Sequence, residues 1–303
     1  MKNIICLFLC ALLLCSCTAP SEQVLPTTTE TLAESDSLCD GQTLKVLAIG
    51  NSFSNNTTDY LYDIAIAEGM TDVTIGRLYI GGCSLERHVR CAKENSTEYK
   101  YYKNNSGHWE LTESATLLYG LQDEEWDIIT LQQSSGNSGQ SDSYDGYLEE
   151  LITYVNANKT NPEAKLVWHM TWAYQGDSNH KDFARYGNNQ DTMYRSIVAA
   201  NQSKILTNNA FSGLIPVGTA VQNARTSYLG DMLTVDGYHL NELGKLIGAY
   251  AWYATFTGVK LDTLKLDVIP GSIKLSENSK TVVAEAVNHA IDAPFMVTQS
   301  SYT

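Results

Sequence analysis

From residue 44 onward, short apolar runs alternate with stretches that have a helical pattern. Strands that alternate with helices predict a parallel sheet covered by helices on both faces. With right-handed crossovers, this arrangement gives a three-layer α/β/α sandwich of flavodoxin-like topology around a five-stranded parallel sheet. The expected strands are residues 44–50, 73–80, 126–131, 166–172 and 214–218. The expected helices are about residues 56–68, 84–95, 145–158, 182–203 and 241–257.

Two further segments lie outside this alternation. Residues 97–121 are rich in tyrosine and asparagine and separate the second helix from the third strand, so we interpret them as an insertion that could form a small hairpin. Residues 276–291 place apolar side chains on one helical face and predict a final helix that docks on the domain. No internal repeat is visible. We therefore interpret residues 43–303 as one domain with an insertion and a C-terminal helical extension.

The N-terminus has the pattern of an export signal. Lys2 precedes an apolar run over residues 4–14 that is too short to span a bilayer as a mature helix. The following Leu14-Cys15-Ser16-Cys17 resembles a bacterial lipobox, in which the signal is cut before a cysteine that then carries lipid. The alternative is a plain secretory signal that is cut nearby.

The lipobox interpretation divides the start of the chain into two parts. Residues 1–16 would be the signal peptide, and residues 17–42, which are rich in Thr, Ser, Glu and Pro, would be a flexible tether. We expect an exported lipoprotein that is anchored to the membrane through Cys17, in the periplasm or on the outer-membrane surface.

The charge and the cysteine content exclude several classes of protein. The formal net charge is −14 and no basic run is present, so binding to nucleic acid is not expected. Four of the seven cysteines belong to the leader, which leaves Cys39, Cys83 and Cys91. This sparse set is not a disulfide scaffold and has no metal-ligand spacing, although one disulfide in an oxidising compartment stays open.

Polar, glycine-containing segments follow the expected strands, and in an open parallel sheet ligands bind at the carboxyl ends of strands. Ser52 follows the first strand and begins a helix, where backbone N–H groups can stabilise negative charge. Taken alone, such a serine is more often a helix cap. Gly82 follows the second strand and lets a backbone N–H approach an oxyanion, although a simple turn would also explain it. Gln133 and Asn137 follow the third strand and offer side-chain amides.

Asp236 and His239 lie three residues apart at a predicted loop-to-helix junction. At that spacing the carboxylate can hold the imidazole tautomer, so that the other ring nitrogen faces a nucleophile. An Asp-Gly turn beside a structural histidine is the alternative for this pair alone. Combined with Ser52 and the glycine after the second strand, the pair indicates a nucleophilic Ser-His-Asp set.

A second Ser-His combination occurs in Gly176-Asp177-Ser178-Asn179-His180. Its serine and histidine are only two residues apart, so they cannot easily adopt triad geometry. We expect this segment to form the rim of a substrate pocket, in which His180 lies with Trp172 and Tyr174. The chain has no Gly-x-Ser-x-Gly motif, which disfavours an α/β-hydrolase nucleophile elbow.

These motifs resemble those of the SGNH (GDSL-like) hydrolase superfamily, and in particular its branch described as domain of unknown function 4886. The resemblance covers about residues 44–258 and rests on the Gly50-Asn51-Ser52-Phe53-Ser54, Gly81-Gly82 and Asp236-to-His239 segments. Asn51 replaces the acid of the usual Gly-Asp-Ser, and the usual Gly-x-Asn-Asp block is absent. The resemblance implies esterase activity, often the deacetylation of carbohydrates, without a metal or cofactor.

The expected function is therefore that of a serine esterase acting on acetyl or short acyl esters of a small molecule or glycan. Ser52 would be the nucleophile, His239 the base and Asp236 its orienting carboxylate. The backbone N–H groups of Ser52 and Gly82 would hold the oxyanion together with Gln133 or Asn137, and we favour Gln133 for its place at the strand end. The alternatives are a non-catalytic glycan-binding lipoprotein and an acyltransferase.

Overall fold

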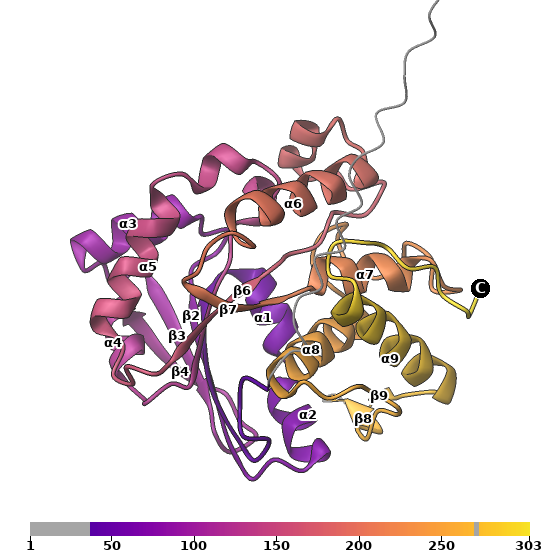
Figure 1. Cartoon of the computed structure of the whole chain (residues 1–303), viewed down its shortest axis with the longest axis horizontal. Coiled ribbons are helices and arrows are strands. Elements are labelled where there is room, and N and C mark those ends of the chain that lie inside the picture. Colours follow the sequence, from indigo (N-terminus) through magenta and orange to yellow (C-terminus); the bar gives the residue numbers. More distant parts are fainter. Residues whose placement is uncertain (1–36, 270–272) are drawn as a thin grey trace, which may run out of the picture. The chain divides into compact units, whose positions relative to one another are not determined.

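The computed structural model describes residues 37–269 and 273–303 (Figure 1). Its main sheet has seven strands in the order β4-β3-β2-β1-β5-β6-β7. The five predicted strands are all present and pair in parallel, and in chain order they lie 2-1-3-4-5, which is the flavodoxin-like arrangement. They are β1 (Thr43–Gly50), β2 (Asp72–Tyr79), β5 (Ile128–Leu131), β6 (Lys165–His169) and β7 (Phe211–Ile215).

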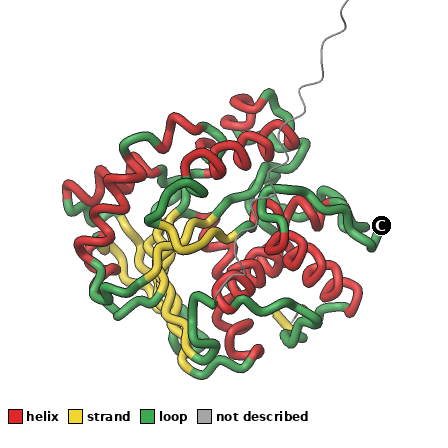
Figure 2. The backbone as a smooth tube through the Cα atoms, in the orientation of Figure 1, coloured by secondary structure: helices red, strands yellow, loops and turns green. Residues whose placement is uncertain are grey.

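The central parallel strands are covered on both faces. All four residues of β5 are buried, as are the last five residues of β1. Continuous apolar runs of this kind are typical of parallel sheets that lie between two layers of helices. Figure 2 shows the strands between two sets of helices, so the predicted α/β/α architecture is confirmed.

The sheet has seven strands where the sequence predicts five. The difference comes from the 97–121 insertion, which forms an antiparallel hairpin of β3 (Tyr99–Asn104) and β4 (Glu110–Ala115). β3 pairs antiparallel with β2 and so extends the sheet at that edge. Five of the six β4 residues are exposed and two of them are glutamates, a composition that protects an edge strand from pairing with other chains.

The helices form two groups, and Figure 1 labels each helix. Next to α8 lie α1, α2, α7 and α9, while α3 contacts α4 and α5. In the first group are α1 (Ser52–Thr58), α2 (Leu61–Glu68), α7 (Val217–Arg225), α8 (Glu242–Thr257) and α9 (Glu277–Asp292). The others are α3 (Leu85–Glu94), α4 (Leu117–Gln122), α5 (Tyr147–Asn158) and α6 (Gln190–Lys204).

Four expected elements differ in their boundaries by three residues or more, or are divided. The strand expected over residues 166–172 ends at His169. The first expected helix is two helices, α1 and α2, and α1 begins directly after β1. The expected helix over 182–203 is a 3₁₀ helix, η3 (Lys181–Tyr186), followed by α6, because Gly187 adopts a left-handed conformation with φ of 65° and ends the first turn. The last expected strand stops at Ile215, because Pro216 precedes α7.

The ends of the described chain pack on this domain. Leu38 donates its backbone N–H to the Phe256 carbonyl, at 2.7 Å, so at least the end of the expected tether contacts α8. The C-terminal helix expected over 276–291 is α9, and a short β8–β9 pair (Val268–Ile269 and Ile273–Lys274) precedes it. Across the described residues, no helix combines the length and the apolar character that a membrane crossing needs. Cys17 and the expected signal peptide lie outside the described residues.

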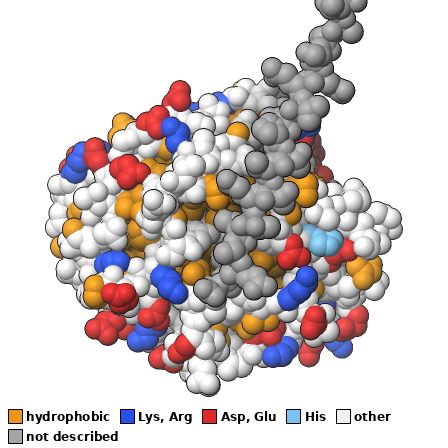
Figure 3. All heavy atoms as spheres, viewed as in Figure 1, with side chains coloured by type: hydrophobic (Ala, Val, Ile, Leu, Met, Phe, Trp, Pro, Cys, Tyr) orange, Lys and Arg blue, Asp and Glu red, His pale blue; other side chains and the backbone are white. Residues whose placement is uncertain are grey.

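Charged side chains are intermixed on the surface. Figure 3 shows blue and red side chains next to one another on the face in view. Pairs such as Lys103 with Asp123, at 2.9 Å, are half-buried rather than fully exposed. Such pairs place acidic and basic groups side by side, while the net charge of −14 remains.

Candidate active site

Ser52 lies where β1 passes into α1. Gly50 ends the strand, and Asn51 is the N-cap of the helix, its side-chain oxygen accepting the Phe53 N–H at 2.9 Å. Ser52 is thus the first helical residue, and its side chain is half-buried. Backbone N–H groups in the first turn of a helix have no partner within the helix. The position combines a partly accessible hydroxyl with a backbone donor.

His239 and Asp236 complete a hydrogen-bonded chain with this serine. The Ser52 Oγ lies 2.8 Å from His239 Nε2, and His239 Nδ1 lies 2.7 Å from Asp236 Oδ2. Since a carboxylate only accepts, Nδ1 carries the proton and Nε2 presents its lone pair to the serine. The structure therefore brings together the three residues expected from sequence.

The Asp236–His239 segment is a tight loop ahead of α8. Asp236 Oδ1 accepts hydrogen bonds from the backbone N–H groups of Tyr238 and His239, at 3.2 and 2.8 Å. Gly237, which follows Asp236, has a left-handed φ of 90°. Leu240 donates its N–H to the side-chain oxygen of Asn56, at 2.9 Å, which ties the loop to α1. Both catalytic candidates are thus held by backbone hydrogen bonds.

Ionisation of Asp236 is favoured by these contacts. Partial burial opposes the charged form, but the hydrogen bonds from the His239 backbone, the His239 ring and the Tyr238 backbone outweigh it and lower the pKa of the Asp236 carboxyl. A charged carboxylate is the form that can hold the Nδ1–H tautomer and stabilise an imidazolium.

Gly82 lies in a turn that follows β2. Cys83 donates its N–H to the Ile80 carbonyl at 3.1 Å, and Gly82 has a left-handed φ of 60°. The side-chain amide of Asn51 donates to the Cys83 carbonyl at 3.1 Å, so this turn is fastened to the residue before Ser52. Gly82 itself is exposed.

Of the two amides expected after the third parallel strand, Gln133 is engaged elsewhere. Gln133 is buried, and its NH₂ group donates to the Ser143 carbonyl and hydroxyl, both at 3.1 Å. Its side-chain oxygen accepts the Leu85 and Ser134 N–H groups. Gln133 therefore acts as a brace between loops, and the expectation that it donates to an oxyanion finds no support. Asn137 lies in a 3₁₀ turn, and its side-chain oxygen accepts from Arg185.

The expected pocket residues lie at different depths. Trp172 and Tyr174 are fully buried, so they do not form a rim as expected. Trp172 stacks on Phe53 with ring centroids 4.0 Å apart and donates to the Tyr238 carbonyl, so it supports the site from below. His180 is half-buried, and its ring lies 4.6 Å from that of Tyr238.

Ser178 and its neighbours lie next to the Asp236–His239 loop. Gln175 donates its N–H to the Gly237 carbonyl at 2.8 Å. The Ser178 Oγ accepts the His180 N–H, and a Cβ on Gly237 would lie 2.9 Å from it. The second Ser-His combination thus packs beside the Asp236 loop, and no hydrogen bond joins its serine to its histidine ring.

Sequence reasoning did not find the buried partners of the nucleophile turn. Gln132 donates to the Asn51 side-chain oxygen at 2.9 Å, and its own oxygen lies 3.1 Å from His169 Nδ1. Tyr238, whose ring centroid is 4.3 Å from that of His239, was also not expected. The position of Gln132 directly after β5 and that of His169 at the end of the adjacent β6 are the signal that could have indicated them.

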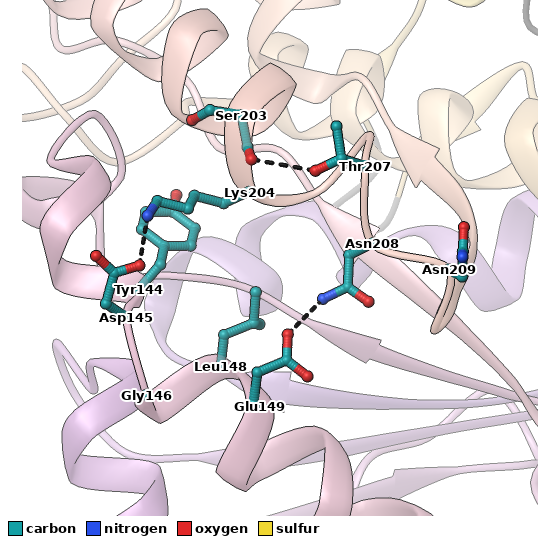
Figure 4. A pocket seen from close by; sticks show the side chains of 10 residues that line it. All are labelled: Tyr144, Asp145, Gly146, Leu148, Glu149, Ser203, Lys204, Thr207, Asn208 and Asn209. Atoms are coloured by element: carbon teal, nitrogen blue, oxygen red, sulfur yellow. Dashed lines mark hydrogen bonds and ion pairs between the residues drawn. The ribbon is translucent and has the colours of Figure 1, made fainter.

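Surface hollows elsewhere contain none of the catalytic candidates. One lies where the start of α5 meets the end of α6 (Figure 4). Its polar groups are paired with one another, Lys204 with Asp145 and Asn208 with Glu149. A second, near the amino end of β1, is lined by residues such as Asp40, Asp127 and Lys165. Neither offers a nucleophile with a base.

The described cysteines and acids make no metal centre. Cys39, Cys83 and Cys91 are free thiols, and burial raises the pKa of Cys83 well above its usual range. Within residues 37–269 and 273–303, no group of three or more His, Cys, Asp or Glu side chains could hold a metal ion.

The fold and site define an α/β/α domain whose Ser-His-Asp set follows the first and last strands of a parallel sheet. Residues 45–289 match the family described as Domain of unknown function (DUF4886), and the chain belongs to this family, which confirms the relationship inferred from the motifs. A DUF4886 family protein from Bacteroides uniformis ATCC 8492 is 40% identical, with a TM-score of 0.79 over 85% of this chain and 98% of that chain.

Two more distant solved structures share part of the arrangement. A candidate SGNH hydrolase from Slackia heliotrinireducens is 20% identical, with a TM-score of 0.49 over 71% of this chain and 99% of that chain. A catalytic mutant of an acetylxylan esterase from Geobacillus stearothermophilus is 11% identical, with a TM-score of 0.45 over 71% and 95% of the two chains. At these values neither neighbour bears on the activity of this chain. No curated protein matches it.

Proposed function

We propose that this protein is a serine esterase that removes acetyl or short acyl groups, with a carbohydrate ester as its substrate. The observation that carries the proposal is the Ser52–His239–Asp236 chain, with distances of 2.8 and 2.7 Å. Both distances are within the range expected of a nucleophile, its base and an orienting group. The proposed site needs no group that the chain itself does not supply.

The proposed reaction has two halves. His239 Nε2 takes the Ser52 proton as Oγ attacks the ester carbonyl, and Asp236 stabilises the resulting imidazolium. The backbone N–H groups of Ser52 and Gly82 stabilise the oxyanion of the tetrahedral intermediate. The imidazolium then protonates the departing alcohol, which leaves an acyl group on Ser52. A water molecule, deprotonated by His239, then attacks this acyl-enzyme, and the imidazolium returns the proton to the Ser52 Oγ as the carboxylic acid leaves.

The accessibility of the site supports a bulky substrate. The side chains of His239 and Asp236 are 29% and 39% exposed, so the reacting atoms lie near the surface rather than in a deep tunnel. The half-buried Tyr238 ring lies beside His239, and a tyrosine offers an apolar face together with a polar edge. Such a ring suits a sugar that carries the ester.

Turnover of p-nitrophenyl acetate, followed by acetate release from acetylated glycans, tests this function. Ser52→Ala and His239→Ala should each lower kcat by on the order of 10⁴-fold, because each removes one member of a catalytic unit. Ser178→Ala is the matched control and should keep most of the activity with an unchanged circular dichroism spectrum. Loss of activity in Ser178→Ala alone, or an inactive wild-type protein on all esters, would reject the assignment.

We also propose that the mature protein is anchored to the membrane through a lipid on Cys17, which lies outside the described residues. The support is the apolar run and the small-residue step before this cysteine. Growth with a clickable palmitate analogue should label the wild-type protein and not Cys17→Ala. Equal labelling of the two proteins would show that Cys17 is not the anchor.

A further inference from the structure

Three buried polar side chains form a hydrogen-bonded chain behind the nucleophile. Asn51, Gln132 and His169 are each 1% exposed. They follow or end β1, β5 and β6, three adjacent strands of the sheet. Since Leu131 is paired with Trp168 in the β5–β6 register, Gln132 and His169 come next on the two strands. The chain therefore crosses the carboxyl edge of the sheet directly beneath Ser52.

The backbone fixes the orientation of each side chain. Asn51 Oδ1 faces the Phe53 N–H at 2.9 Å, so it must be the oxygen, and Asn51 Nδ2 donates to the Cys83 carbonyl at 3.1 Å. Gln132 Nε2 then donates to Asn51 Oδ1, at 2.9 Å, and to the Gln133 carbonyl, at 3.4 Å. The remaining Gln132 oxygen faces His169 Nδ1 at 3.1 Å, and this nitrogen has to donate.

His169 ends the chain as a neutral ring. Its Nε2 is buried and has no hydrogen-bond partner, which fits an unprotonated nitrogen. Burial lowers the pKa of His169 to about 3, so the ring carries no charge at neutral pH. The ring packs edge to face against Trp252, with centroids 5.2 Å apart. Only the Nδ1–H tautomer of His169 satisfies the chain.

Gly50, the last residue of β1, packs closely against the Gln132 side chain. A Cβ on Gly50 would lie 2.6 Å from the Ser54 hydroxyl and 2.8 Å from the Gln132 side-chain oxygen. Any side chain at position 50 would collide with the Gln132 side chain, so glycine is needed for the β1 backbone to lie this close to Gln132. The close approach also holds the β1–α1 junction against β5.

We infer that Asn51, Gln132 and His169 are positioning residues, which hold the Gly82 turn at a fixed place relative to Ser52. The inference rests on the proposed esterase function and deepens it. Asn51 is the link, because one end of its amide caps α1 and the other binds the Cys83 carbonyl. Gln132, held in turn by His169, adds a second hydrogen bond to the Asn51 oxygen and so reinforces the orientation that the backbone gives this amide. Nucleophile and oxyanion donor are thereby tied through one side chain.

The chain also accounts for asparagine in place of the usual aspartate at position 51. An aspartate at this position would turn an oxygen toward the Cys83 carbonyl, where a donor is needed, and a buried pair of acceptors is unfavourable. Asn51→Asp should therefore release the Gly82 turn while still capping α1. This one change therefore separates the capping role of the Asn51 oxygen from the role of its nitrogen in holding the Gly82 turn.

Steady-state kinetics with a matched histidine control test the inference. His88 is also fully buried, and its ring has one hydrogen bond, to the Tyr99 hydroxyl, and an unpartnered Nε2. Its ring is not hydrogen-bonded to Asn51, Gln132 or His169. His169→Phe and Asn51→Asp should lower kcat about 100-fold, the effect of misplacing a reacting group by about 1 Å, with KM within about twofold of wild type. His88→Phe should leave kcat unchanged. Equal kcat in His169→Phe and His88→Phe would overturn the inference.

A second measurement does not depend on activity or on variants that fold. Long-range ¹H–¹⁵N correlation spectra of the wild-type protein report which ring nitrogen of His169 is protonated. The chain requires Nδ1–H at pH 7, and an Nε2–H tautomer would reject it. If the wild-type protein has the Nδ1–H tautomer but turns over no ester, the proposed function is rejected and the hydrogen bonds inferred for Asn51, Gln132 and His169 still stand.

Discussion

Single residues at the site have roles that depend on backbone conformation as much as on side-chain chemistry. Gly82 and Gly237 both adopt left-handed conformations, one in the turn after β2 and one between Asp236 and His239. In that region an ordinary residue is strained by about 1–2 kcal/mol. Glycine thus lets the Gly82 turn and the Asp236–His239 loop adopt backbone conformations that other residues would strain.

Replacing Gly82 by alanine should therefore impair catalysis more than stability. A Cβ on Gly82 would meet no atom within 4 Å, so the change adds backbone strain without a clash. Relief of that strain would rotate the Gly82 N–H away from the oxyanion, and loss of one such donor costs about 100-fold in kcat. Ester hydrolysis assays and thermal unfolding measure the two effects.

Gly146→Ala is the control for this experiment. Gly146 has a similar φ of 77° and also open space around its Cβ position, but it caps α5 away from Ser52. Both variants should lose a similar amount of unfolding free energy, and only Gly82→Ala should lose kcat. Matching kcat values in the two variants would remove Gly82 from the proposed oxyanion site.

At the scale of elements, the strand ends decide what meets at the site. The alternation of apolar runs with helical stretches predicts five parallel strands, and their carboxyl ends bring Ser52, Gly82 and His239 to one edge without any knowledge of distances. The spacing of Asp236 and His239 is local, so a short loop was enough to predict their contact. These parts of the fold and the site were available from sequence.

The parts that were missed depend on contacts between distant segments. The pairing of the hairpin β3–β4 with β2 follows from the edge that β2 offers, which the 97–121 segment does not reveal by itself. Gln132 and Gln133 are adjacent and chemically identical, and only the three-dimensional structure separates them. Gln132 turns toward Asn51, while Gln133 turns toward Ser143, because successive residues leave a strand on opposite sides.

At the scale of the whole molecule, two fully buried neutral histidines couple folding to pH. His169 ends β6 and is hydrogen-bonded to Gln132, and His88 lies on α3 and is hydrogen-bonded to Tyr99 of the β3–β4 hairpin. Burial lowers the pKa of each ring to about 3. In the unfolded chain a histidine has a pKa of about 6.5. Between these two values the unfolded state binds protons that the folded state does not.

The free energy of unfolding should accordingly fall as pH falls from about 6.5 toward 3. The unfolded state binds more protons in this window, so stability rises with pH, with a slope of about 1.4 kcal/mol per pH unit for each buried histidine. The slope is about half of this value at pH 6.5 and disappears about one pH unit higher, where the unfolded rings are also neutral. Urea unfolding of the wild-type protein and of the double variant His88→Phe/His169→Phe, at intervals from pH 7.5 to pH 4.5, isolates this contribution. The double variant should have the flatter profile below pH 6.5, whatever its absolute stability, and parallel profiles would mean that the two rings take up protons in the folded protein.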